Sequence, residues 1–213
     1  MTSTTPPNGA LLEAKDLTLW RGERCLFRQL SFGLAPGQLL HIRGSNGCGK
    51  TSLLRVLCGL TLPEDGDVMW RGTKVINSRA DFHAELSYVG HRESLKAELT
   101  AEENLVHDLG LRAGLGRQAV REALSKVRLQ KAMDIPCRSL SAGQRRRVSL
   151  ARCIASGARL WILDEPYTNL DIAGRELVDT VMTEQLERDG MVLLVAHQDH
   201  GVRHPAINTL EMD

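Results

Sequence analysis

The chain has 213 residues with a formal net charge of +1, and 42% of its residues are hydrophobic and 25% charged. These values are typical of one folded domain, and the near-neutral charge argues against a dominant nucleic-acid surface. No apolar run approaches the roughly 20 residues that cross a bilayer, and the N-terminal residues lack the basic and apolar stretches of a secretory signal. Five cysteines without a Cys-x-x-Cys pair argue against a disulfide framework or a zinc site.

The N-terminal part of the chain divides into a leader and two strand-like stretches. Residues 1–9 are rich in Ser, Thr and Pro, and we expect a flexible leader before a single domain at 10–213. The stretches 12–20 and 25–34 alternate between apolar and polar residues on either side of a turn at Gly22. This pattern favours a pair of antiparallel strands.

The rest of the chain alternates between short apolar runs and helical patterns. The apolar runs lie at 39–42, 160–163 and 191–196. Continuous apolar runs are typical of strands covered on both faces, so the sequence predicts an α/β fold with a largely parallel sheet. Residues 93–157 are rich in Glu, Ala, Leu and Arg, which predicts an inserted helical lobe.

A phosphate-binding loop is predicted directly after the first apolar run. Residues 44–51 match G-x-x-x-x-G-K-[ST] at each fixed position, and a helical pattern follows at 51–60. The glycines let backbone N–H groups surround phosphate oxygens at the start of a helix. Lys50 is expected to contact the β- and γ-phosphates of a nucleotide, and the Thr51 hydroxyl to bind Mg²⁺. The predicted phosphate-binding residues are Gly44, Ser45, Asn46, Gly47, Cys48, Gly49, Lys50 and Thr51.

Two adjacent carboxylates follow the apolar run 160–163. Asp164 at the end of this strand is predicted to bind Mg²⁺, and Glu165 to orient or deprotonate the attacking water. Together with the phosphate loop, this pair predicts a P-loop nucleotide hydrolase or transferase. A kinase and a GTPase remain open at this point.

Three further motifs narrow the class. The segment LSAGQ at 140–144 resembles the LSGGQ signature of the ABC family, with Ala142 in place of the first glycine. The segment TNLD at 168–171 resembles the D-loop of that family, and VAH at 195–197 resembles its switch-histidine segment. From about Leu11 to the C-terminus, the chain therefore resembles an ABC-type ATP-binding domain.

The resemblance implies a P-loop core with an N-terminal antiparallel subdomain and an inserted helical lobe. It also implies a head-to-tail dimer with a second ATP-binding subunit, in which two ATP molecules are enclosed between the subunits. Ser141 and Gly143 would then bind the partner's nucleotide, and Asp171 would shape the facing subunit. His197 would contact the γ-phosphate and hold the geometry for hydrolysis, with Glu165 as the other catalytic residue.

Two positions depart from the family pattern. His91 stands where the family has a glutamine in the metal shell, and a neutral imidazole is a poor Mg²⁺ ligand, so His91 is expected to contact water or to transmit movement. Trp20 is the nearest aromatic residue for stacking on adenine, but it lies one residue out of step. Arg21 is the alternative. The basic run 145–147 is interpreted as a solvated helix face rather than a phosphate contact.

Within the ABC family, several local patterns resemble the ATP-binding subunits of cytochrome c maturation systems in Gram-negative bacteria. These are the GSNG start of the phosphate loop, Gly90-His91, the segment 95–105 and the short C-terminal region. The resemblance implies a peripheral protein on the cytoplasmic face of the inner membrane, bound to integral membrane permease subunits. ATP hydrolysis would support heme delivery or release of a heme chaperone.

Three alternatives stay open. The chain is an ATPase of a different importer or exporter, a soluble ABC protein that acts on ribosomes or DNA, or a P-loop kinase. The last two are disfavoured, because one chain with a single phosphate loop lacks the paired cassettes or long arms of the soluble proteins, and because kinases lack the signature segment.

Overall fold

The computed structural model describes residues 7, 9–91, 93–113 and 116–212. The predicted leader at 1–9 therefore lies outside the described residues, apart from Pro7 and Gly9. Within the described ranges, no helix is both long enough and apolar enough to cross a bilayer.

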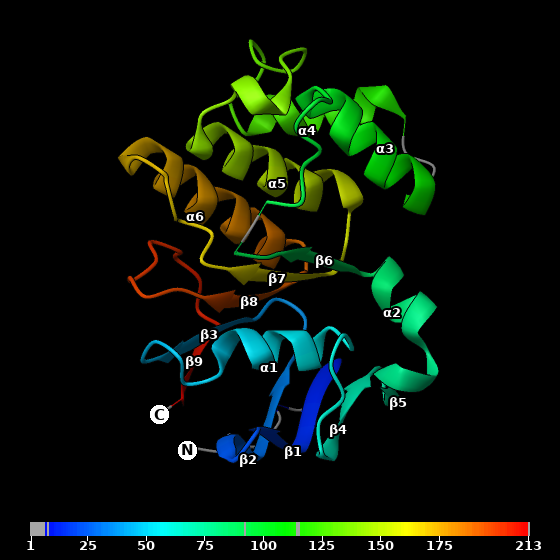
Figure 1. Ribbon diagram of the computed structural model, residues 1–213, viewed down its shortest axis with the longest axis vertical. Coiled ribbons are helices and arrows are strands. Elements are labelled where there is room, and N and C mark those ends of the chain that lie inside the picture. The colour runs from blue at the N-terminus through cyan, green and yellow to red at the C-terminus, as the bar shows by residue number, and fades with distance from the viewer. Residues whose placement is uncertain (1–6, 8, 92, 114–115, 213) are drawn as a thin grey trace.

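The first sheet is antiparallel and contains β1 and β2, shown in blue in Figure 1, and β4 and β5, shown in teal. Its strand order is β2-β1-β4-β5, so β1 pairs with both β2 and β4. The predicted pair of antiparallel strands is confirmed, whereas β4 and β5 were not predicted. The bounds are Leu12–Arg21 for β1, Arg24–Leu34 for β2, Asp65–Trp70 for β4 and Thr73–Lys74 for β5.

The second sheet is parallel and has the strand order β6-β7-β8-β3-β9. The three predicted apolar runs form β3, β7 and β8 in the middle of this sheet. The C-terminal strand β9 pairs with β3 and was not predicted, because its alternating polar residues resemble a surface segment. The bounds are Leu39–Gly44 for β3, Leu86–Val89 for β6, Leu160–Asp164 for β7, Met191–Val195 for β8 and Ile207–Met212 for β9.

The parallel sheet is buried on both faces, which explains its continuous apolar runs. Alternate residues of each strand enter different cores, because successive side chains point to opposite faces. Trp161 and Leu163 of β7 join the core that includes the helical lobe. Leu160 and Ile162 of the same strand join the core that includes α1 and the antiparallel sheet.

The helices cover the two faces of this parallel sheet (Figure 1). α3, α4 and α5 form the predicted helical lobe, and α6 runs beside α5. α1 ends at Leu57 rather than at residue 60 as predicted, and Leu60 is exposed. The helix bounds are Lys50–Leu57 for α1, Arg79–Ala84 for α2, Ala101–Ala113 for α3, Arg117–Lys126 for α4, Ala142–Ser156 for α5 and Ile172–Glu187 for α6. Short 3₁₀ turns lie at Val75–Asn77 and Cys137–Ser139.

The parallel strands position the candidate site at one edge of the sheet. β3, β7 and β8 run in the same direction, so their carboxyl ends lie side by side. The phosphate loop leaves β3, the two carboxylates follow β7, and the segment with His197 leaves β8. Crevices outside the carboxyl ends of parallel strands are the usual ligand sites of such sheets.

Candidate nucleotide-binding site

The phosphate loop connects β3 to α1 and needs glycine at two positions. A Cβ atom on Gly44 would lie 2.0 Å from the Met212 carbonyl oxygen, so a side chain there would displace the end of β9. Gly49 precedes α1 with a φ of 111°, which is strained for any residue with a side chain. The loop is therefore shaped by a close approach and by a left-handed backbone.

The Lys50 side chain points back into the phosphate loop. Its Nζ atom donates hydrogen bonds to the carbonyl oxygens of Gly44 at 2.8 Å and of Ser45 at 2.9 Å. The residue is 8% exposed, so the ammonium group is held at the base of the loop rather than extended into solvent. This placement puts a positive charge where a phosphate would lie against the loop.

Thr51 and Asp164 bring the phosphate loop and β7 together. The Thr51 hydroxyl donates a hydrogen bond to Asp164 Oδ2 at 3.3 Å, and Asp164 is 2% exposed. Burial raises the pKa of Asp164, and the Thr51 hydroxyl and the charges of His91, Arg146 and Lys50 oppose this rise. A hydroxyl and a carboxylate at this distance suit Mg²⁺, which prefers oxygen ligands.

The described residues contain no group of three or more His, Cys, Asp or Glu side chains arranged for a metal ion. Mg²⁺ commonly takes one or two protein oxygens and completes its shell with phosphates and water. Thr51 and Asp164 supply two oxygens of the kind that Mg²⁺ prefers.

Glu165 occupies a strained turn at the end of β7. Its φ is 52°, a left-handed value that is uncommon for a residue with a side chain, and its N–H donates to the Val195 carbonyl at 2.8 Å. The Glu165 carboxylate lies 3.5 Å from the His197 Nε2 atom. Two segments that are far apart in sequence thus place an acid and an imidazole together.

These residues line a cleft of about 570 Å³. Asn46, Gly47, Gly49, Lys50, Thr51, His91, Asp164, Glu165 and His197 are the predicted site residues that line it. Arg21, Leu26, Ser52, Thr168 and Val195 line it as well. Arg21 was the alternative adenine contact, and Thr168 and Val195 lie in the TNLD and VAH motifs. Leu26 and Ser52 belong to no motif identified in the sequence.

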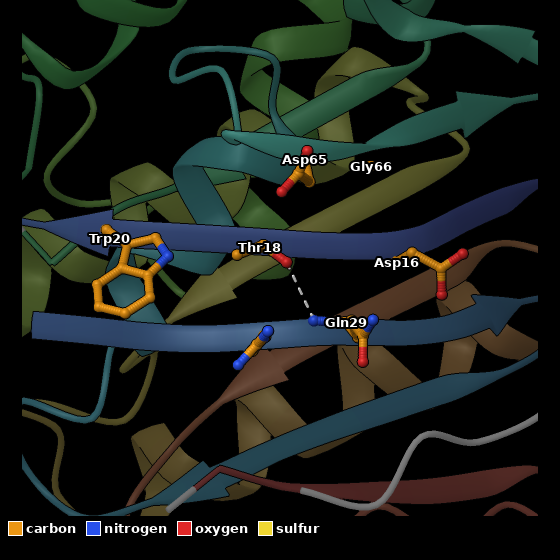
Figure 2. A pocket seen from close by; sticks show the side chains of 7 residues that line it. Asp16, Thr18, Trp20, Gln29, Asp65 and Gly66 are labelled. Atoms are coloured by element: carbon orange, nitrogen blue, oxygen red, sulfur yellow. Dashed lines mark hydrogen bonds between the residues drawn. The ribbon is translucent and has the colours of Figure 1, made fainter.

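Trp20 lies in a different hollow, on the antiparallel sheet (Figure 2). It is 44% exposed and shares this hollow of about 330 Å³ with Asp16, Thr18 and Arg28, among others. Successive residues of a strand point to opposite faces, so Arg21 faces the cleft while Trp20 does not. The structure thus does not bring the predicted adenine-stacking residue Trp20 to the cleft.

Ser141, Gly143 and Asp171 lie outside the cleft of the same chain, at the starts of α5 and α6. Ser141 forms a capping box with Gln144, in which the Gln144 N–H donates to Ser141 Oγ at 3.1 Å. A Cβ atom on Gly143 would lie 2.7 Å from the Asn169 carbonyl oxygen. Asp171 caps α6 by accepting from the Gly174 N–H at 2.8 Å. The three residues support the starts of α5 and α6 and are not among the residues that line this cleft.

The basic run 145–147 was interpreted as a solvated helix face, and for Arg146 this interpretation was wrong. Arg146 is 3% exposed, whereas Arg145 and Arg147 are half-buried. The helical spacing contains the missed signal, since Ser149 and Cys153 lie three and seven residues after Arg146 and are also buried.

The site therefore combines a loop for phosphates, two oxygens for Mg²⁺ and a carboxylate near an imidazole. Such a site binds a nucleoside triphosphate and positions a water molecule for attack on its terminal phosphate. These features define a P-loop nucleotide-binding protein.

Comparison with known proteins agrees with this class. Residues 27–168 match the ABC transporter family. Two solved structures share the fold. One is an ATP-binding subunit of an ABC transporter, with a TM-score of 0.78 and 24% identity over 88% of this chain and 79% of that chain. The other is a putative ABC transporter ATP-binding protein from Pyrococcus furiosus, with a TM-score of 0.81 and 20% identity over 94% of this chain and 96% of that chain.

Closer relatives carry the name Cytochrome c biogenesis ATP-binding export protein CcmA. The protein from Yersinia pseudotuberculosis is 46% identical over 90% of this chain and 88% of its own length. Those from Methylococcus capsulatus and Nitrosomonas europaea are 45% and 43% identical, over 91% and 92% of this chain and 94% and 93% of their own lengths. The chain thus belongs to the ABC transporter family and, within it, to the same family as these CcmA proteins.

Proposed function

We propose that this chain binds and hydrolyses ATP as the ATP-binding subunit of a membrane ABC complex for cytochrome c biogenesis. Hydrolysis there drives heme delivery or release of a heme chaperone. The observation that carries the proposal is the meeting of the phosphate loop, Asp164, Glu165 and His197 in one cleft. The names of relatives that are more than 40% identical support the biological role.

Nucleotide binding starts from groups that the fold already holds in place. The negative charge of the β- and γ-phosphates attracts the Lys50 ammonium more strongly than the neutral carbonyls that now hold it. The N–H groups at the start of α1 add further donors. Thr51 and Asp164 hold the Mg²⁺ ion, which supplies charge neutralisation at the phosphates.

Glu165 and His197, which follow β7 and β8, have separate roles in hydrolysis. Glu165 orients the attacking water and accepts its proton as the new oxygen–phosphorus bond forms at the γ-phosphate. The bond between the γ-phosphorus and the bridging oxygen breaks, and ADP leaves with that oxygen. His197, 3.5 Å from Glu165, donates to the γ-phosphate and holds its orientation.

The remaining predicted residues act in a second subunit. In a head-to-tail dimer, Ser141 and Gly143 present the start of α5 to the partner's ATP, and Asp171 contacts the facing subunit. The capped and closely packed geometry of these residues supports this role, because a preformed helix start needs little rearrangement to meet a phosphate. The complex lies on the cytoplasmic face of the inner membrane, with integral membrane permease subunits as partners.

The test replaces the gene in the native host with a Glu165→Gln version and stains membrane proteins for covalently bound heme. We expect c-type heme to be lost while b-type cytochromes persist. Glu176→Gln, an exposed position on α6, is the matched control and should leave c-type heme unchanged. Normal c-type cytochromes in the Glu165→Gln strain would overturn the proposed role in cytochrome c biogenesis.

A further inference from the structure

Arg146 has an unusual position for an arginine. It is 3% exposed, and its guanidinium group donates to three carbonyl oxygens from two separate segments of the chain. Nη2 donates to the Asp164 carbonyl, Nε to the Pro166 carbonyl at 3.4 Å and Nη1 to the Gly90 carbonyl at 2.7 Å. One side chain of α5 therefore connects the turn after β7 with the segment after β6.

These carbonyl groups belong to residues that flank Glu165 and His91, and the groups themselves have no assigned role in hydrolysis. The carbonyls of Asp164 and Pro166 lie on either side of Glu165, whose φ of 52° needs support from its surroundings. The Gly90 carbonyl precedes His91, which lines the nucleotide cleft. Arg146 itself is not among the residues that line the cleft.

The shape and charge of the side chain fit this position. A guanidinium group presents several N–H donors in a rigid plane, whereas a lysine ammonium is a point charge. Burial lowers the pKa of Arg146, and the carboxylates of Glu93, Asp164 and Glu165 oppose this fall. A buried charge is costly unless it is hydrogen-bonded and compensated, and here it has both kinds of support.

The neighbouring arginines provide an internal comparison. Arg147 donates to the carbonyls of Val127 and Arg128 at 3.3 Å, in the helical lobe. Arg145 donates to the Leu140 carbonyl, near the start of its own helix. Among the hydrogen bonds that these three arginines form with the described residues, only those of Arg146 reach the residues around Glu165, so the role in hydrolysis is specific to this position.

We propose that Arg146 is a positioning residue for ATP hydrolysis, which fixes the main chain on both sides of Glu165 and connects it to the His91 segment and to α5. It acts through Glu165 and does not bind the nucleotide. The inference rests on the proposed catalytic role of Glu165. It also gives the start of α5 a direct connection to the catalytic turn of its own subunit.

The test compares Arg146→Lys with Arg147→Lys in the purified full chain. Misplacement of a catalytic group by about 1 Å lowers the rate about 100-fold, so we expect kcat of Arg146→Lys to fall roughly 10- to 100-fold. The KM for ATP should stay within about twofold, because the phosphate loop is untouched. Arg147→Lys should keep both constants within about twofold.

Three further measurements decide the outcome. Arg146→Gln keeps two donors and should retain more activity than Arg146→Leu, and thermal unfolding shows whether each variant is folded. Unchanged kcat in Arg146→Lys would overturn the proposal, as would a KM that rises in proportion to the loss of rate. If no replacement of Arg146 folds, the residue is structural and the proposal also fails.

Measuring Glu165→Gln in the same assay tests the catalytic role of Glu165 separately from the positioning role of Arg146. An active Arg146→Lys beside an inactive Glu165→Gln removes only the positioning role. An active Glu165→Gln instead removes the assignment on which that role depends.

Discussion

The starts of α1 and α5 are both predicted to contact phosphates, but the two helix starts differ in their capping. Gly49 precedes α1, and in the described part of the chain no side chain caps this helix. Ser141 precedes α5 and closes a capping box with Gln144. The comparison teaches that α1 keeps its N–H donors for a ligand within its own chain. At the start of α5, the capping box already satisfies some of the N–H donors, so a phosphate there must share this helix start with Ser141 and Gln144.

The largest expected effect is at the start of α1. Lys50→Ala removes the only predicted cationic side chain of the loop, and we expect ATP hydrolysis to fall by about 100-fold or more, the size seen when a group that stabilises transition-state charge is removed. Binding of a fluorescent ATP analogue measures the accompanying loss of affinity. Lys74→Ala, at an exposed position on β5, is the control. Normal turnover in Lys50→Ala would show that the loop does not act as we propose.

The next effect concerns Asp164 and pH. Burial raises the pKa of Asp164, so protons compete with Mg²⁺ at a higher pH than they would at an exposed aspartate. Below this raised pKa, the Mg²⁺ concentration for half-maximal rate should increase about tenfold for each unit of pH lost. Above it, the requirement should level off. A Mg²⁺ titration of the ATPase rate across pH measures this, and Asp164→Asn should remove the dependence.

A smaller effect is expected at α5. Ser141→Ala removes the hydroxyl that accepts from the Gln144 N–H, which should lower the free energy of unfolding by about 1 kcal/mol. The melting temperature should fall by about 2–4 °C. ATP binding to the isolated subunit should not change, while turnover should fall because the dimer interface loses a phosphate contact. Weaker ATP binding by the isolated subunit would contradict the division of roles between α1 and α5.

The smallest expected effect is on ATP affinity, and it compares a residue of the cleft with a residue of the hollow on the antiparallel sheet. Arg21→Ala should weaken ATP binding by about fivefold, because a guanidinium group that stacks on a base at a partly exposed site contributes about 1 kcal/mol. Trp20→Ala, in the adjacent residue, should leave ATP affinity unchanged. The reverse result would return adenine stacking to Trp20. Affinities for GTP measured in parallel show whether either residue selects the base.

The sequence predicts most of the fold because the signals at its centre are local. The buried strands β3, β7 and β8 are continuous apolar runs, and the phosphate loop is a contiguous motif with a definite backbone requirement. Strands β4 and β9 were missed because they carry polar residues, and their pairing depends on partners far away in sequence.

The candidate site divides in the same way. Asp164 and Glu165 were predicted from their place after a buried strand, and the structure brings both to the cleft. Arg146 was misread, because its function depends on carbonyl groups of residues that are up to 56 positions away. Trp20 and Arg21 could not be distinguished, since β1 has irregular pairing near residues 17 to 20 and the facing direction there depends on those irregularities.

The pairing of β9 with β3 has a consequence for synthesis on the ribosome. Gly44, the first residue of the phosphate loop, lies against the Met212 carbonyl, which belongs to the last strand of the sheet. The N-terminal part of the chain emerges first, but the loop obtains its final support only after residue 212 has left the exit tunnel. Nascent chains that have not yet exposed β9 therefore cannot assemble a complete ATP site.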